Sequence, residues 1–202
     1  ANINTIDGQA GQAGTAGGGL GTDFTYTISD APATLNTASA GGGDLAVLNA
    51  ATSYTANAAL SLAEATQLIQ DGNFDDVYSI EDTNSQFVVV APAEDATLLT
   101  DAVTVTISED VGGVEADLTY VAYASVDAVV LTDSLAALDT SRGLGAAGAV
   151  SFATSITIDE ATAGGNDDIT MANIAEVNAL VAVVSATTYT VVDSYADFYT
   201  NG

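Results

Sequence analysis

Acidic side chains interleaved with glycine are the one set of residues in this sequence whose types and spacing could do chemistry. Three segments carry them: residues 71–76 (DGNFDD), 109–117 (EDVGGVEAD) and 159–168 (DEATAGGNDD). Calcium prefers hard oxygen ligands from carboxylates and carbonyls, and glycine lets the backbone fold around the ion. Calcium is therefore the candidate cofactor, with Asp167 and Asp168 as the first choice of ligands. The candidate metal ligands are Asp167, Asp168, Asp159, Asp71, Asp75 and Asp76.

Two interpretations of these segments stay open. Their spacing does not match an EF-hand, so they can equally be solvated acidic turns between strands. The glutamates could also supply a general acid and base for glycoside hydrolysis, which needs two carboxyl groups facing one sugar bond. The sequence has no Trp, which sugar sites favour, and nothing marks a particular pair. We therefore expect no enzyme and no catalytic residues.

The charge balance excludes several classes of protein. The 202 residues include 27 Asp and Glu against one Lys or Arg, a formal charge of −26, although 48% of the residues are hydrophobic. Without a basic surface, binding to nucleic acid or to an anionic membrane is not expected. The absence of His and Cys removes imidazole bases, thiol nucleophiles and the usual zinc sites. The single cation, Arg142, is expected to form an ion pair with an acidic neighbour.

Location and membrane insertion follow from the same composition. No apolar run approaches the ~20 residues that span a bilayer, so we expect no membrane insertion. An extremely acidic surface repels itself less in salt, because salt shortens the range of electrostatic interactions. This composition favours an extracellular or high-salt setting.

A weak internal repeat organises most of the chain. Four segments alternate apolar and polar residues and end on Asp, at intervals of about 50 to 60 residues: residues 26–30, 78–82, 129–133 and 189–193. A second strand-like run follows in three of the units: residues 53–56 (SYTA), 104–107 (TVTI) and 155–158 (SITI). These landmarks predict a Gly-rich arm at 1–22, which is a linker or a donor strand, and a repeat domain at 23–202. Its repeats would cover about 23–74, 75–125 and 126–185, with a partial repeat at 186–202.

Local patterns predict both strands and helices. Alternation of Tyr, Ile, Val and Thr is typical of strands. The Asp that ends each strand precedes a helix start, where a carboxylate can accept bonds from free backbone amides. Residues 61–64 (SLAE) have capping-box spacing, residues 171–184 predict a helix, and residues 86–91 predict a strand. The expected fold is mainly β with short α-helices, with about three and a half degenerate ~50–60-residue repeats stacked solenoid-like or as a sandwich.

The segments YSIEDTNSQF, YTVVDSYADF and VVLTDSLAAL, with the Ala-rich LSLAEATQLI and ITMANIAEVNAL, carry a resemblance. This pattern resembles the Asp-Thr or Asp-Ser ("sDTaanl") repeats of very large secreted bacterial surface proteins, which include surface-layer, sheath, adhesin and haemolysin-type calcium-binding proteins. The resemblance implies a secreted, repetitive structural protein. The tandem GGxGxD calcium motif of the wider group is not present, and residues 164–168 are a single degenerate match.

The expected function is therefore that of a structural extracellular subunit, which self-assembles into a surface layer, sheath or filament. Its partner would be itself, through the N-terminal arm and a Tyr- and Phe-rich C-terminal surface. The alternative is a repeat module of a calcium-dependent adhesin. More distant alternatives are a glycoside hydrolase and an ice-binding protein that presents its Thr-x-Thr runs as a hydroxyl ladder.

Overall fold

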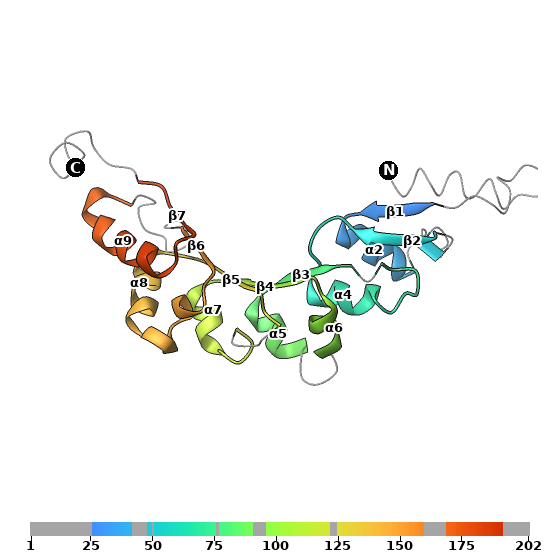
Figure 1. Ribbon diagram of the computed structural model, residues 1–202, viewed down its shortest axis with the longest axis horizontal. Helices are drawn as coiled ribbons and strands as arrows, with labels where there is room; N and C mark the ends of the chain where they lie inside the picture. The colour runs from blue at the N-terminus through green and yellow to red at the C-terminus, as the bar shows by residue number, and fades with distance from the viewer. Residues whose placement is uncertain are drawn as a thin grey trace, which may run out of the picture. The chain divides into compact units, whose positions relative to one another are not determined.

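The computed structural model describes residues 26–41, 48–49, 51–75, 77–90, 96–121, 125–159 and 169–191. The chain divides into two compact units, the first made of 1–81 and 93–104 and the second of 82–92 and 105–202. Each unit alternates strands with helices, as Figure 1 shows. No helix within the described ranges is long and apolar enough to cross a membrane.

The first unit is built around a pair of parallel strands. Strand β1 (Thr27–Asp30) leads through α2 (Pro32–Ser39) to β2 (Ser53–Ala56), and α4 (Leu62–Leu68) leads on toward β3 (Ser79–Asp82). Helix α6 (Ala96–Asp101) follows later in the chain. In the β1–β2 pair, Ile28 lies opposite Tyr54, and both side chains are buried. Parallel neighbours need a crossover connection, and α2 is that crossover here.

Four strands of a larger, five-stranded sheet belong mainly to the second unit. After α5 (Asn84–Val90) come β4 (Thr104–Glu109), α7 (Val111–Ala116), β5 (Ala128–Asp133) and α8 (Leu135–Gly143). Two short 3-10 turns, η1 (Gly145–Ala147) and η2 (Ala149–Ser151), precede β6 (Ser155–Ile158). The turn η4 (Met171–Asn173), helix α9 (Ile174–Val183) and β7 (Thr187–Thr188) complete the unit. Strands β4 to β7 lie side by side in chain order, and each adjacent pair is parallel.

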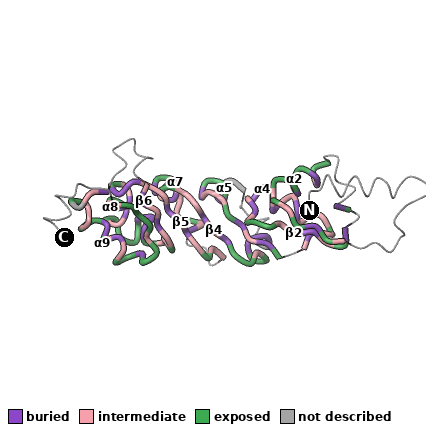
Figure 2. The backbone as a smooth tube through the Cα atoms, turned by 90° about the horizontal axis from the view of Figure 1, so that it is seen from above, coloured by how far each residue is buried: buried purple, intermediate pink, exposed green. Residues whose placement is uncertain are grey.

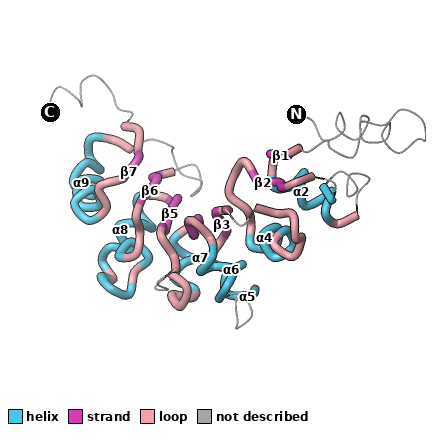
Figure 3. The backbone as a smooth tube through the Cα atoms, turned by 45° about the vertical axis from the view of Figure 1, so that its right-hand side comes forward, coloured by secondary structure: helices cyan, strands magenta, loops and turns pink. Residues whose placement is uncertain are grey.

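The core of the second unit lies between its strands and its helices. Helices α7, α8 and α9 lie along one side of the strands (Figures 1 and 3). Side chains alternate between the two faces of a strand, and every second residue is buried, as can be followed along β4 and β5 in Figure 2. The buried strand residues are Val105, Ile107, Val129, Leu131, Ile156 and Ile158.

The predicted fold class, mainly β with stacked solenoid-like or sandwiched repeats, is wrong. The protein is an α/β fold in which helices connect parallel strands. The helices are short and bury few side chains: α7 buries only Val111 and Val114, and α9 buries Val177 and Leu180. Such helices show little of the apolar periodicity by which a sequence reveals a helix. The strand signals therefore dominated the prediction.

The strand predicted at residues 86–91 is also wrong, because residues 84–90 form helix α5. The Thr83 carbonyl accepts the first helical hydrogen bond from the Phe87 amide (3.3 Å). Phe87 is fully buried, and the buried Asn84 amide bonds to the end of α7. These tertiary contacts outweigh the weak preference of three consecutive valines for a strand.

Other local predictions are confirmed. Ser61 and Glu64 form the expected capping box, in which the Ser61 Oγ accepts from the Glu64 amide and the Glu64 carboxylate accepts from the Ser61 amide. The helix expected from residue 171 forms as η4 and α9 and ends at Val183. The strands expected at 53–56 and 155–158 have those bounds. The strand expected at 189–193 is displaced, because β7 covers residues 187–188. Residues 192 and 193 of the expected strand lie outside the described residues, as does the predicted arm at 1–22.

Candidate functional site

The aspartates that end the strands fix the turn from strand to helix. The Oδ1 atoms of Asp30, Asp82 and Asp133 each accept a hydrogen bond from the next backbone amide, at 2.7, 2.8 and 2.7 Å. Ser134, which follows Asp133, is the N-cap of α8, because its Oγ accepts from the Ala137 amide (3.3 Å). In the Asp-Ser pattern before α8, Asp133 therefore fixes the turn and Ser134 caps the helix.

Asp133, the last residue of β5, also forms a hydrogen bond to the start of α7. Its Oδ2 atom accepts a hydrogen bond from the amide of Val111, the first residue of α7, at 3.1 Å. Asp110, the N-cap of α7, accepts from the Gly113 amide at 2.6 Å. Free amides at helix starts attract negative charge, so both carboxylates stabilise the turns that they occupy.

The three predicted metal ligands that the structure describes, Asp71, Asp75 and Asp159, do not lie in a common acidic cluster. Asp167, Asp168 and Asp76 lie outside the described residues. In the part of the chain that is described, no three or more acidic residues are arranged to hold a metal ion. Asp159 directly follows β6, and its amide donates to the Asp133 carbonyl; the Asp75 amide donates to the Tyr54 carbonyl (both 2.9 Å).

Asp71 accepts hydrogen bonds from two hydroxyl groups. Its Oδ2 atom lies 2.5 Å from the Ser39 Oγ at the end of α2 and 2.8 Å from the Tyr54 hydroxyl on β2. Tyr54 is 1% exposed. Burial, together with the bond to Asp71 and its charge, raises the pKa of Tyr54. This carboxylate therefore joins α2, β2 and the turn after α4, and sequence reasoning had treated it as a metal ligand.

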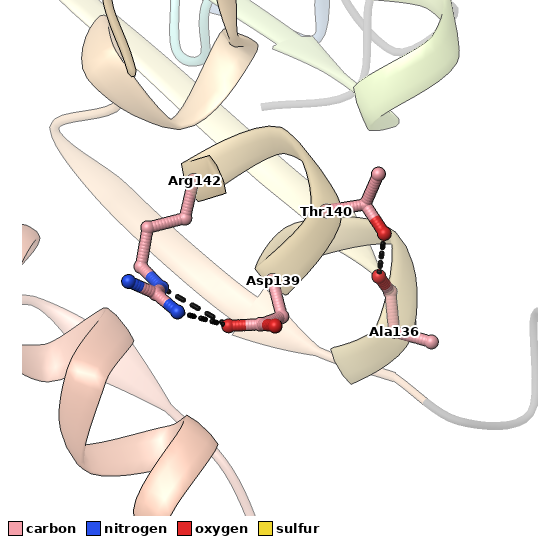
Figure 4. Close-up of polar contacts among 4 residues, drawn as sticks. All are labelled: Ala136, Asp139, Thr140 and Arg142. Carbon is pink, nitrogen blue, oxygen red and sulfur yellow. Dashed lines mark hydrogen bonds and ion pairs between the residues drawn. The ribbon is translucent and has the colours of Figure 1, made fainter. Parts of the chain in front are cut away.

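Arg142 has the partner that its isolation predicts. Its Nε and Nη2 atoms lie 3.0 and 2.5 Å from the Asp139 Oδ1 atom, one turn earlier in α8 (Figure 4). Both side chains are about one-third exposed. An exposed pair of this kind contributes little to stability, about 0.5 kcal/mol. The expected ion pair is confirmed.

Three surface hollows in the described part of the chain could in principle hold an active site. One, beside β6 and β7, contains Asp159 as its single carboxylate, and another, beside α2 and α4, contains Asp71. The third is lined by Ala56–Ala59, Val77–Ser79 and Val103, and has no carboxylate. None of the three brings together the two carboxyl groups that glycoside hydrolysis needs.

Strands β1 and β7 are edge strands among the described residues. Strand β1 pairs only with β2, and β7 only with β6. The carbonyls of Tyr26 and Asp30 accept hydrogen bonds from the β2 side, at 2.9 Å each. Because successive residues of a strand point their backbone groups to opposite sides, those of Thr27 and Ser29 point to the open edge. Such an edge can accept a further strand.

The face of the second unit's strands that points away from the helices is uncharged. We call it the outer face, and its residues are mainly Ser and Thr: Thr106, Ser108, Ala128, Val130, Thr132, Ser155, Thr157 and Thr188. All are exposed or half-buried. The register aligns Thr132, Thr157 and Thr188 in one row across three strands.

No family model matches this sequence, and neither the curated proteins nor the solved structures include a significant match.

Proposed function

We propose that this protein is a structural subunit that self-assembles into an extracellular layer, sheath or filament. The observation that carries the proposal is the pair of edge strands: β1 and β7 each end a row of parallel strands and pair on one side only within the described residues. A strand from another copy can add to either edge through backbone hydrogen bonds. The resemblance to secreted surface repeats and the acidic composition support an extracellular location.

The β1 edge lacks the features with which proteins usually prevent such pairing. Natural edges are protected by lysine, proline or a bulge. Strand β1 has the sequence TISD, with no lysine or proline, and pairs with β2 over four consecutive residues without a bulge. The only charge is Asp30, whose carboxylate is engaged by the Ala31 amide. As far as the described residues show, the edge can therefore accept a strand from a second copy, such as its N-terminal arm (residues 1–22).

A proline at the edge tests the proposal. Ser29→Pro removes an amide that points away from β2, so it should block strand addition and leave the β1–β2 ladder in place. Ser29→Ala keeps the amide and is the matched control. We expect the proline variant to shorten or abolish polymers seen by negative-stain microscopy, with the alanine variant like the wild type.

Polymers of unchanged length in Ser29→Pro would contradict pairing at this edge. Circular dichroism melts of both variants separate loss of assembly from loss of folding. A similar melting temperature is expected, since β1 keeps its buried Ile28 and its partner β2.

A further inference from the structure

We infer that the outer face is a second assembly contact, which docks against the outer face of another copy. The inference rests on the proposed function and extends it, because it adds a contact between sheets to the pairing of strand edges. The occupant is a second copy of this chain.

The outer face has no ionisable residue of its own, although Asp159 lines the same hollow as Thr157 and Thr188 at one end of it. None of its eight residues is ionisable, whereas the full chain carries a formal charge of −26. Carboxylates lie instead on the helices and near both ends of the strands of this unit: Glu115, Asp139, Glu176, Asp110, Asp127, Asp133 and Asp159. Like charges brought together on binding cost several kcal/mol, so two copies meet most favourably through a neutral face.

Among the described residues no helix of this unit covers the outer face, which is unusual for parallel strands. Parallel sheets occur almost only with both faces covered. Helices α7, α8 and α9 lie on one side of β4 to β7 (Figures 1 and 3). On the other side Thr132, Val130 and Thr157 are half-buried. A second copy supplies the missing layer, and hydroxyl groups facing hydroxyl groups can exchange hydrogen bonds as donors and acceptors.

The area of the outer face limits how strongly two copies can associate through it. Four strands at the usual spacings make a face of about 15 Å by 13 Å, or roughly 200 Å². A stable complex buries about 800 Å² on each partner. The face alone therefore gives a weak dimer. In a polymer held by strand edges the contact recurs along the length, so it joins two strips side by side and sets the thickness of the polymer.

A charge placed at the centre of the face tests the inference. Thr157 is the middle residue of the row Thr132–Thr157–Thr188. Thr157→Asp introduces a carboxylate there, and Thr157→Asn has the same size without the charge. Thr140→Asp adds the same charge on α8, where Thr140 is exposed and its hydroxyl bonds only within the helix (Figure 4).

The readouts are mass per unit length by electron microscopy and association by sedimentation, with a thermal melt to confirm folding. We expect Thr157→Asp to halve the mass per unit length, while Thr157→Asn and Thr140→Asp match the wild type. Wild type and Thr157→Asp with equal mass per length would overturn the inference but leave edge pairing intact. A wild type that stays monomeric at every concentration and salt level overturns the proposed function as well.

A third possible result would indicate that the outer face binds ice and not a second copy. A row of threonines on a sheet face can also order water, as an ice-binding surface does. Thermal hysteresis in the wild type that is lost in Thr157→Asp, with assembly unchanged, would overturn docking by a second copy in favour of ice.

Discussion

Single carboxylates in this chain are satisfied by backbone amides and hydroxyl groups. With one basic residue for 27 acidic ones, ion pairs can neutralise very few of these carboxylates. Asp133 accepts from the Ser134 and Val111 amides, and Asp71 accepts from the Ser39 and Tyr54 hydroxyls. Hydrogen bonds to a charged group are the stronger kind, about 1.5–3 kcal/mol each. An acidic protein of this type can therefore build a folded structure with almost no cations of its own.

The raised pKa of Tyr54 leads us to expect that the protein loses stability at alkaline pH. Its folded pKa is raised, chiefly by burial, so above pH 10 the unfolded chain loses a proton that the folded chain keeps. The free energy of unfolding then falls as pH rises above 10, by up to about 1.4 kcal/mol per pH unit. Urea unfolding between pH 8 and 11 measures this slope.

Tyr54→Phe should reduce that alkaline slope, whereas Tyr189→Phe, at a tyrosine that is 38% exposed, should not. Phenylalanine at position 54 also removes one hydrogen bond to Asp71 and should cost about 1 kcal/mol at neutral pH. The same alkaline slope in wild type and Tyr54→Phe would show that this hydroxyl does not cause the effect.

The acidic residues Asp167 and Asp168 lead to a second prediction, which concerns the melting temperature in calcium. We expect millimolar calcium to raise the melting temperature above that in EGTA, because a metal that binds only the folded state stabilises it by about 2.7 kcal/mol at a hundredfold excess over Kd. Changing Asp167 and Asp168 to Asn should remove the rise. Sodium at matched ionic strength is the control, and an equal response to sodium would reduce these residues to a solvated acidic loop.

For the secondary-structure elements, the positions of the strands could be predicted from the sequence, but the pairing of the strands could not. The strands at 53–56 and 155–158 follow from local alternation, and the α4 start follows from the Ser61–Glu64 capping box. The pairing depends on contacts between distant residues, such as Thr157 with Thr188, which no local pattern specifies. The same limit applies to the candidate site. Asp71 has an acidic, Gly-flanked sequence, yet the hydroxyls that satisfy it come from α2 and β2.

Asn84 illustrates a contact between elements that the sequence did not reveal. Its side-chain amide donates to the Gly113 carbonyl (3.0 Å) and the Asp117 carbonyl (2.8 Å), and the residue is 1% exposed. Asn84→Ala removes both donors and leaves two carbonyls without them, so we expect a loss of about 2–3 kcal/mol of unfolding free energy. Urea unfolding measures it.

The matched control is Gln86→Ala, an exposed position on the same helix, which should change stability by less than about 0.5 kcal/mol. Equal effects of the two substitutions would mean that Asn84 does not anchor α5 to α7.

At the scale of the whole molecule, net charge opposes assembly and salt should favour it. Copies that each carry a formal charge of −26 repel one another at low ionic strength. Screening shortens the reach of that repulsion from about 10 Å at 0.1 M salt to about 3 Å at 1 M. Contacts through strand edges and an uncharged face are not themselves weakened by salt. Assembly should therefore strengthen as sodium chloride rises.

The most direct test of self-assembly is the mass of the native chain in solution, followed by small-angle X-ray scattering over a range of protein concentrations at 0.1 M and 1 M sodium chloride. We predict that the mean mass grows with concentration and is larger at 1 M salt. A constant mass of one chain, 20.1 kDa, at every concentration and in both salts would contradict the account.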